Sequence, residues 1–337
     1  MRPASSIRRA CLRGAAGAAL LAAARLASAA PAKRARLVLA GPSAAISNPL
    51  VRMAEAGMLA DLADEVKFVA WKDPDQLRLL ALEGQADLLA MPSNVAANLY
   101  NRGVDLRLLG VPSWGVLWMV SRDAALKTLA DFKGKEIVMP FRGDMPDIVL
   151  RLLAEKQGLQ QGRDYSLRYA ASPLDAMQLL VMRRADHALL AEPAVSMALR
   201  KTRSFPLGMV APELHRSVDM QREWGRVMQR APRMPQAVLT LLGPVAADAA
   251  LVERLQRDYA AALRWCQGAP AECGRLVASR IAQLAPEAVA DAIAVDNARF
   301  VAPAEARGEL EFFYGQLLAR QPGLVGGRLP DARFYGG

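Results

Sequence analysis

Residues 75–99 read DQLRLLALEGQADLLAMPSNVAANL, and residues 175–199 read DAMQLLVMRRADHALLAEPAVSMAL. Each stretch opens with Asp75 or Asp175 at the start of a helix-like apolar pattern. A short apolar run follows an Ala-Asp pair, and a second helix-like pattern follows that run. The two stretches match when they are shifted by one residue before the Ala-Asp pair and by two after it. This internal echo suggests a chain built from two lobes of similar construction.

The same alternation extends outward along the chain. From residue 36, short apolar runs such as RLVLA and VKFVA alternate with longer helical patterns, and a second series begins after WGVLWMVS at residues 114–121. This alternation is typical of βαβ units around a mostly parallel sheet, so we predict an α/β fold. We expect SFPLGMV (204–210) and RMPQAVLTLLG (233–243) to be returning strands, and residues 244–320 to be almost wholly helical.

The first 29 residues have the features of a secretory signal peptide. Arg8, Arg9 and Arg13 form a basic start, residues 14–24 are apolar, and residues 27–29 read ASA. The stretch SIRRACLR also approximates a twin-arginine signal, so the general secretory route and the twin-arginine route both stay open. We therefore predict a periplasmic protein.

The remainder of the chain excludes two classes of partner. No other apolar run approaches the roughly 18 residues of a membrane span, so we expect the mature chain not to be membrane-spanning. Without the five arginines of the leader, 38 basic and 33 acidic residues remain, a charge too small and too dispersed to indicate nucleic acid. We expect a monomer.

The reactive side chains favour binding over catalysis. Cys266 and Cys273 are separated by QGAPAE between two helical patterns, and both a disulfide and two free thiols remain open. His187 and His215 have no cysteine or carboxylate at metal-ligand spacing, and His187 is interpreted as a core or lobe-lining residue. No nucleotide-binding or nucleophile motif occupies a strand-to-helix turn. We therefore predict a protein that is not an enzyme, without a cofactor or a metal.

Polar and aromatic residues follow nearly every predicted strand. In open α/β sheets, ligands bind beyond the carboxyl ends of the strands, where helix N-termini present unpaired amides. The candidate ligand-binding residues at these positions are Ser43, Ser47, Asn48, Trp71, Ser93, Asn94, Trp114, Arg142, Gly143, Asp144, Met145 and Glu192. Each Ser, Asn or Asp could equally be an ordinary helix cap, and the two tryptophans could equally pack under a loop.

The stretch MPFRGDMPD (139–147) shows how such a turn is built. We expect a strand over residues 136–140 and a tight turn at Gly143. Asp144 is predicted to cap the following helix, with Asp147 in the position of a capping box. Arg142 would then be free to face a ligand.

Several segments together resemble a known family. GVLWMVSRD, TLADFKGKEIVMPF, GDMPD, SPLDAMQLL and ADHALLAEPA span most of residues 34–210, and the tail GGRLPDARFY adds a further likeness. In combination they resemble the periplasmic substrate-binding proteins of the nitrate, sulfonate and taurine ABC importers.

The resemblance implies a bilobal periplasmic-binding-protein fold of type II, in which two hinge crossings join two βαβ lobes. The first lobe would comprise residues 34–113 with residues 209–337, whose C-terminal helices pack on it. The second lobe would comprise residues 117–207, with crossings near Trp114 and residues 205–208. The ligand would lie between the lobes, and the closed form would dock on an ABC transporter permease with its ATPase.

The resemblance also implies that the solute contacts come from the twelve candidate residues above. For an anion such as nitrate, a sulfonate, taurine or bicarbonate, Arg142 would be a bidentate partner and the helix starts at Asn94 and Asp144 would supply amides. Asp144 and Glu192 would repel an anion and suit an amine-bearing solute instead. The sign of the ligand charge therefore stays open.

Two alternatives to that transport function follow from the same superfamily. One is a binder of a thiamine-precursor pyrimidine or another amine-bearing heterocycle. The other is a pyrimidine-precursor synthase, an enzyme that uses a histidine and a cysteine-rich metal site, neither of which is visible in this sequence. A ligand-sensing domain of a regulator is disfavoured by the leader peptide.

Overall fold

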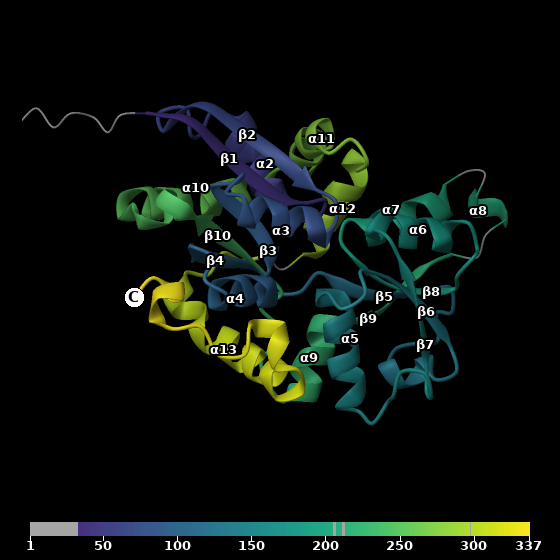
Figure 1. Cartoon of the computed structure of the whole chain (residues 1–337). Helices are drawn as coiled ribbons and strands as arrows, with labels where there is room; N and C mark the ends of the chain where they lie inside the picture. Colours follow the sequence, from purple (N-terminus) through teal and green to yellow (C-terminus); the bar gives the residue numbers. More distant parts are fainter. Residues whose placement is uncertain (1–32, 205–206, 211–212, 297) are drawn as a thin grey trace, which may run out of the picture.

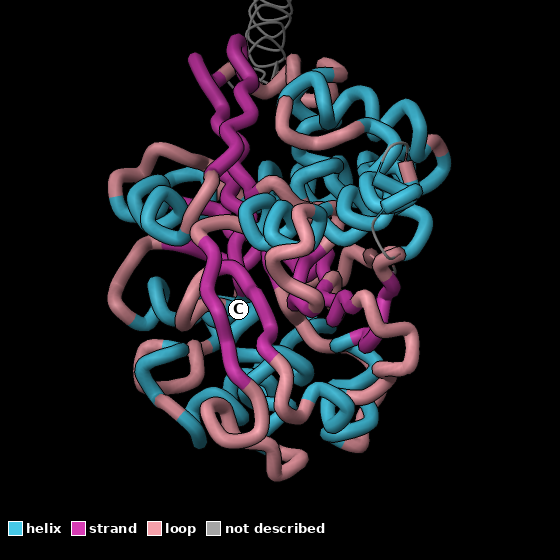
Figure 2. The backbone as a smooth tube through the Cα atoms, turned by 90° about the vertical axis from the view of Figure 1, so that its right-hand side faces the viewer, coloured by secondary structure: helices cyan, strands magenta, loops and turns pink. Residues whose placement is uncertain are grey.

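The apolar runs of the sequence form two five-stranded sheets, one in each of two lobes (Figure 1). The computed structural model describes residues 33–204, 207–210, 213–296 and 298–337. The predicted signal peptide lies outside the described residues. Helices flank the strands on both sides (Figure 2), as expected for an α/β fold.

The first sheet has the strand order β2-β1-β3-β10-β4. Its strands are β1 (Arg34–Pro42), β2 (Ala63–Trp71), β3 (Leu88–Pro92), β4 (Leu106–Ser113) and β10 (Ala237–Leu242). β1 runs parallel to β2 and β3, whereas β10 runs antiparallel to β3 and β4. The central strand β3 is buried over its first four residues, which explains why it reads as an unbroken apolar run.

The second sheet has the order β7-β6-β8-β5-β9. Its strands are β5 (Leu117–Ser121), β6 (Glu136–Pro140), β7 (Ser166–Ala170), β8 (His187–Ala191) and β9 (His215–Asp219). β6 runs parallel to β7 and β8, and β5 runs antiparallel to β8 and β9. Position for position, the order repeats that of the first sheet, with one antiparallel strand fourth in each.

The internal echo of the sequence falls on equivalent elements. Residues 75–99 form most of α3 (Pro74–Leu82), β3 and most of α4 (Ser93–Asn101), while residues 175–199 form most of α6 (Pro173–Val181), β8 and most of α7 (Ala194–Arg203). Both α3 and α6 begin with proline after a residue whose side chain caps the helix, Asp73 and Ser172. The echo therefore reflects repeated architecture.

The remaining helices complete the two lobes. They are α2 (Ser47–Glu55), α5 (Met145–Glu155), α8 (Leu207–Val210), α9 (Met220–Met228), α10 (Ala249–Gly268), α11 (Pro270–Arg280), α12 (Pro286–Val295) and α13 (Pro303–Arg320), with the short 3-10 helices η1 (Leu129–Phe132), η2 (Gly243–Ala247), η3 (Pro322–Val325) and η4 (Ala332–Tyr335). Among the described residues, no helix has the length and apolarity needed to cross a membrane.

The C-terminal part packs on the first lobe, as expected. Asn98 and Asn101 of α4 donate from their side-chain amides to backbone carbonyls of the tail, to Gly323 at 2.6 Å, Val325 at 2.7 Å and Arg328 at 2.8 Å. Figure 1 shows α13 beside α4 at the lower edge of this lobe. The asparagines of SNVAANLYN thus hold the chain terminus in place.

The boundary predicted for the second lobe is wrong at its C-terminal side. Within SFPLGMV, the described residues Leu207–Val210 form a helix and not part of a strand, and β9 still pairs within the second sheet, with α9 directly after it. The return crossing therefore lies between Met228 and Ala237, and the second lobe extends past residue 207. β9 is an edge strand with only Val218 fully buried, so it carries no apolar alternation that would reveal it.

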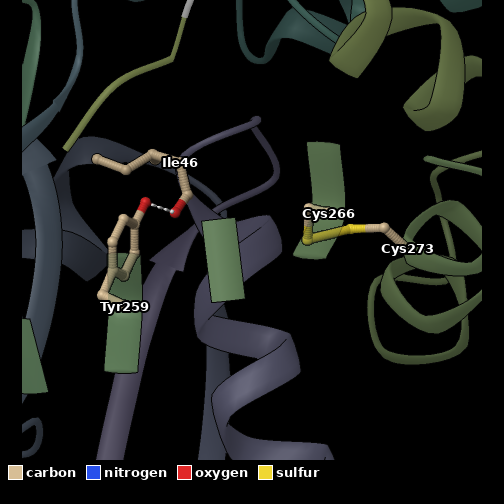
Figure 3. The surroundings of a disulfide bond; sticks show 4 residues. All are labelled: Ile46, Tyr259, Cys266 and Cys273. Carbon is tan, nitrogen blue, oxygen red and sulfur yellow. Dashed lines mark hydrogen bonds between the residues drawn. A yellow bond between two sulfur atoms is a disulfide. The ribbon is translucent and has the colours of Figure 1, made fainter. Parts of the chain in front are cut away.

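Cys266 and Cys273 form a disulfide between the end of α10 and the start of α11 (Figure 3), one of the two states that the sequence left open. The same view shows the Tyr259 hydroxyl, which donates to the Ile46 carbonyl at 2.9 Å. Burial raises the pKa of Tyr259 well above its usual value, so the hydroxyl keeps its proton. This bond anchors the turn before α2.

Among the described residues, ion pairs join the lobes outside the sheets. Arg78 of α3 faces Asp144 at 3.6 Å, Arg200 of α7 pairs with Asp291 of α12, and Arg320 of α13 pairs with Glu155 of α5 at 2.6 Å. Each pair joins a residue of the first lobe to one of the second. The two lobes are therefore braced against each other at several separate places.

Candidate binding site

A cavity of about 250 Å³ lies between the two lobes. Its walls come from the turns after β1, β2, β6 and β7, from the ends of β3 and β8, and from the two crossings between the lobes. The carboxyl ends of parallel strands in both sheets thus meet at one place, where such folds bind ligands.

Five of the twelve candidate residues line this cavity: Ser43, Trp71, Asp144, Met145 and Glu192. Trp71 contributes its ring as wall while its indole N–H donates to the Ala90 carbonyl at 3.0 Å. Met145, 2% exposed, opens α5 from the second lobe. The two lobes therefore each supply apolar surface to one cavity.

Most of the other candidate residues near the first lobe make hydrogen bonds to backbone carbonyls of the protein itself. Ser47 donates to the Pro42 carbonyl at 2.6 Å, and Ser93 donates to the Pro235 carbonyl at 2.6 Å. Asn94 donates to the Leu324 carbonyl at 3.4 Å, and the indole N–H of Trp114 donates to the carbonyls of Val111 and Arg299. Asn48 lines a separate void of about 20 Å³ behind the turn before α2.

Arg142 does not line the cavity. It is exposed, and its guanidinium lies over the ring of Tyr169, 4.5 Å from the ring centre. Gly143, also exposed, has φ +76°, the left-handed conformation that the tight turn requires of it. The anion partner expected from the sequence is therefore not part of the cavity wall.

The predicted capping box at this turn is wrong. Asp144 holds the N-cap position of α5, but its side chain accepts no capping hydrogen bond. The carboxylate of Asp147 instead accepts from the Gly143 N–H at 2.8 Å. Asp147 therefore binds the backbone of the turn, and the Asp144 side chain faces Arg78 across the cleft.

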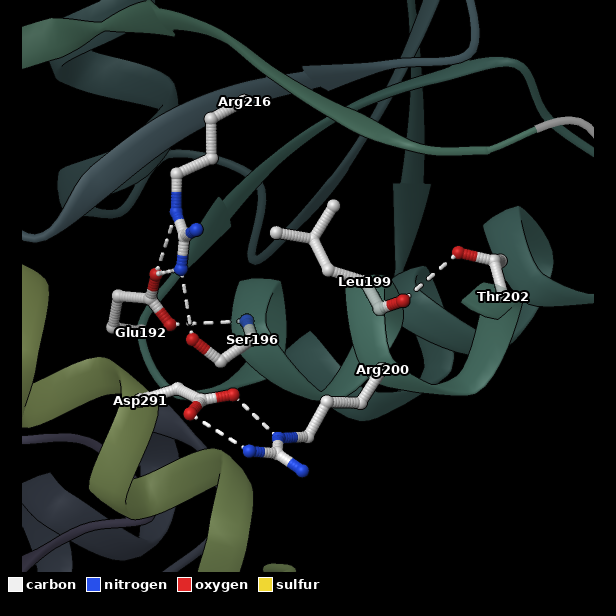
Figure 4. Close-up of polar contacts among 7 residues, drawn as sticks. All are labelled: Glu192, Ser196, Leu199, Arg200, Thr202, Arg216 and Asp291. Atoms are coloured by element: carbon white, nitrogen blue, oxygen red, sulfur yellow. Dashed lines mark hydrogen bonds and ion pairs between the residues drawn. The ribbon is translucent and has the colours of Figure 1, made fainter. Parts of the chain in front are cut away.

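Glu192 is held by an internal network (Figure 4). Its Oε1 accepts from Arg216 at 2.6 Å and 3.1 Å, and its Oε2 accepts from the Ser196 N–H at 3.0 Å. Arg216 also donates to the Ser196 hydroxyl at 2.8 Å. Glu192 is 2% exposed and lines the cavity. Its negative charge is already balanced by Arg216.

Asp144 is buried without such a network. It is 9% exposed, and its Oδ1 lies 3.6 Å from Arg78, beyond the usual length of a hydrogen bond. Burial raises the pKa of Asp144 above its ordinary value, although Arg78 acts in the opposite direction. Such a carboxylate still has acceptor capacity for a solute.

Sequence reasoning missed residues of the hinge and of the C-terminal part. Gln236 accepts from the Val116 N–H at 3.1 Å and donates its own N–H to the Ser113 carbonyl at 3.1 Å, so it ties the two crossings together beside the cavity. Leu284 enters from the turn between α11 and α12. No local pattern marks Gln236, because its role depends on where the second crossing lies, and none marks Leu284.

His187 is a core residue, as interpreted. Its Nδ1 lies 2.9 Å from the Ser121 hydroxyl, and its ring meets Phe132 edge to face. Burial lowers the pKa of His187, which favours the neutral ring. Across the described ranges, no group of three or more histidine, cysteine or acidic side chains could hold a metal ion.

Solved structures resemble this architecture. No family model and no curated protein matches the sequence. An ABC transporter structure from Parabacteroides distasonis is 22% identical, with a TM-score of 0.71 over 90% of this chain and 99% of that chain. The alkanesulfonate-binding protein SsuA from Xanthomonas axonopodis pv. citri, bound to MOPS, is 17% identical, with a TM-score of 0.63 over 89% and 96% of the chains.

The nitrate-binding protein NrtA from Synechocystis PCC 6803 is 14% identical, with a TM-score of 0.65 over 87% of this chain and 84% of that chain. At these identities the likeness concerns the fold, and it confirms the bilobal type II architecture expected from the sequence. This chain therefore has the fold of the substrate-binding proteins of ABC importers.

Proposed function

We propose that this chain is an extracytoplasmic solute-binding protein that captures a small solute between its lobes and delivers it to the permease of an ABC importer. The observation that carries the proposal is the cavity, whose walls are supplied by both lobes. A solute in this position contacts both lobes at once, so its binding energy favours the closed arrangement. The predicted leader supports a periplasmic location.

The disulfide bears on the synthase alternative. A pyrimidine-precursor synthase needs cysteine thiols at a metal site, whereas Cys266 and Cys273 are joined to each other at the end of α10. Among the described residues that line the cavity, the ionisable side chains are carboxylates and one lysine, without a histidine. These features support capture of a solute without chemical change.

Thermal unfolding of the mature chain tests this proposal. The probes are nitrate, bicarbonate, taurine, alkanesulfonates, alkylamines and pyrimidines, each at millimolar concentration. We expect at least one to raise Tm, because a ligand that binds only the folded state stabilises it. The solute should be recovered unchanged.

A cavity-filling variant locates the binding. Ala44 lines the cavity and is partly exposed, so Ala44→Trp should fill the space and abolish the Tm shift. Gln85→Trp, at an exposed position outside the cavity, is the matched control and should keep the shift. A shift that survives in Ala44→Trp, or turnover of the solute, would contradict the proposal.

A further inference from the structure

The ionisable side chains that line the cavity are unevenly divided between acids and bases. Asp144 and Glu192 are buried acids, 9% and 2% exposed, whereas Lys72 is the base and is exposed at the rim. A charge in a low-dielectric wall acts on a ligand far more strongly than one surrounded by water. Among the described residues, the wall itself therefore presents buried carboxylates and no buried cation, while Arg216 and Arg78 pair with these carboxylates from outside the wall.

The two acids differ in what they can offer a solute. Glu192 accepts hydrogen bonds on both oxygens from Arg216 and the Ser196 N–H. The Asp144 carboxylate accepts no hydrogen bond from any described residue and has only the longer ion pair with Arg78. Asp144 is thus the acid at the cavity whose carboxylate keeps acceptor capacity for a donor of the solute.

The remaining wall is largely apolar. Trp71, Leu77 and Ile46 come from the first lobe, and Met145 and Leu174 from the second. Apolar walls reward burial of hydrocarbon or aromatic surface and offer an inorganic oxyanion no replacement for its water. The cavity volume of about 250 Å³ suits a small organic molecule.

We infer, resting on the proposed function, that the cavity selects an organic solute with an apolar body and a protonated amine that binds the Asp144 carboxylate. An ammonium group would supply the short, charge-assisted hydrogen bonds that Asp144 lacks. A sulfonate or nitrate in the same place would lose its hydration beside the Asp144 carboxylate, with Arg142 over Tyr169 and outside the cavity wall. Arg78 partly neutralises Asp144 while the cavity holds no amine.

Calorimetric titration with three probes of identical body tests the inference: 2-phenylethylamine, 2-phenylethanol and 2-phenylethanesulfonate. A hydrogen bond to a charged group contributes about 1.5–3 kcal/mol, so the amine should bind at least about tenfold more tightly than the alcohol. The sulfonate should bind more weakly than the alcohol, because it meets like charge.

A matched pair of variants assigns the effect to Asp144. Asp144→Asn should weaken the amine about 10- to 100-fold and leave the alcohol nearly unchanged. Asp75→Asn removes an equal charge that also faces Arg78, at 3.2 Å, but its side chain is 97% exposed. This control should change amine affinity less than about threefold, since exposed charges are screened. The Tm of each unliganded variant shows that it is folded.

The outcomes separate this inference from the proposed function. Tighter binding of the sulfonate or of nitrate than of the amine would overturn the inference and leave solute capture intact. Equal amine affinity in Asp144→Asn and the unaltered chain would also overturn it. If none of the three probes binds, the inference fails, while solute capture is decided by the wider panel and the Ala44→Trp variant.

Discussion

What a side chain binds within the protein decides whether it can bind a solute. The sequence placed three charged candidates in the same kind of position, because Arg142, Asp144 and Glu192 each follow a predicted strand. In the structure Arg142 is stacked on Tyr169, Glu192 is paired with Arg216, and Asp144 has only a longer ion pair. The three residues therefore differ in their availability to a ligand.

Replacement of Arg142 tests the placement of this residue. Because Arg142 is exposed and lies outside the cavity wall, Arg142→Ala should leave solute affinity within about twofold, as surface substitutions commonly do. Titration with the solute that gives the largest Tm shift provides the measurement. A loss of tenfold or more would restore Arg142 as an anion partner and contradict the geometry described above.

The pH dependence of amine binding follows from the raised pKa of Asp144. Burial raises it, Arg78 lowers it, and Asp75 and Asp147 raise it further. Since this carboxyl takes up a proton above its ordinary range near 3.8, while an alkylammonium stays charged, amine affinity should be full near neutral pH and fall on acidification. Titrations from about pH 7 to about pH 4.5 measure it, and Asp144→Asn should give a flat profile. Tighter binding in acid would contradict this assignment.

Single residues were only partly predictable. Trp71, Asp144 and Met145 line the cavity, because the ends of parallel strands meet there in this fold, and their contact with a solute stays a prediction. The same rule also selected Ser93, which bonds a backbone carbonyl. The sequence alone does not distinguish residues that contact a ligand from residues that bond the backbone. Both roles use the same types of side chain at the same turns.

At the level of elements, the polar face of α4 forms hydrogen bonds to the C-terminal tail. Asn101 donates to the carbonyls of both Val325 and Arg328. Replacement by alanine leaves these acceptors without their donor, so Asn101→Ala should cost about 1–2 kcal/mol in the free energy of unfolding.

Urea unfolding and hydrogen exchange check the role of Asn101. We expect faster exchange over residues 322–328 in the variant, and no such change in Gln85→Ala, which alters an exposed position. If exchange in the tail stays the same, the hydrogen bonds of Asn101 are not what anchors it.

The strands and helices were predicted where their apolar patterns were strong. β3 and β8 are buried runs within the echo, and each was expected. β9 was missed because its polar residues His215, Arg216 and Asp219 do not give the apolar pattern of a strand. It is an edge strand, and it pairs with β5, which lies far from it in the sequence. That error moved the second crossing and removed Gln236 from consideration.

For the whole molecule, the placement of the lobes relative to each other depends in part on ion pairs that join them. A hydrogen bond from Arg200 lowers the pKa of Asp291, so this pair persists at neutral pH and is lost only as the pH falls below the ordinary range of an aspartate. Arg200→Ala should favour opening of the unliganded protein, by up to about 1 kcal/mol for an exposed pair, or about fivefold in population.

Small-angle scattering measures the effect of Arg200→Ala as a larger radius of gyration. Arg280→Ala is the matched control, because its partner Glu55 lies on α2 of the same lobe. Equal radii for Arg200→Ala and Arg280→Ala would show that the pair between α7 and α12 does not restrain the lobes.

Closure of the lobes on a solute is the central claim, and a distance between the lobes tests it most directly. Spin labels at Gln85→Cys in the first lobe and Met182→Cys in the second, both exposed, report that distance by pulsed electron resonance while Cys266 and Cys273 stay oxidised. With the solute that gives the largest Tm shift, we predict one narrow distribution at shorter distance than without it. An unchanged distribution with that solute bound would contradict capture between the lobes.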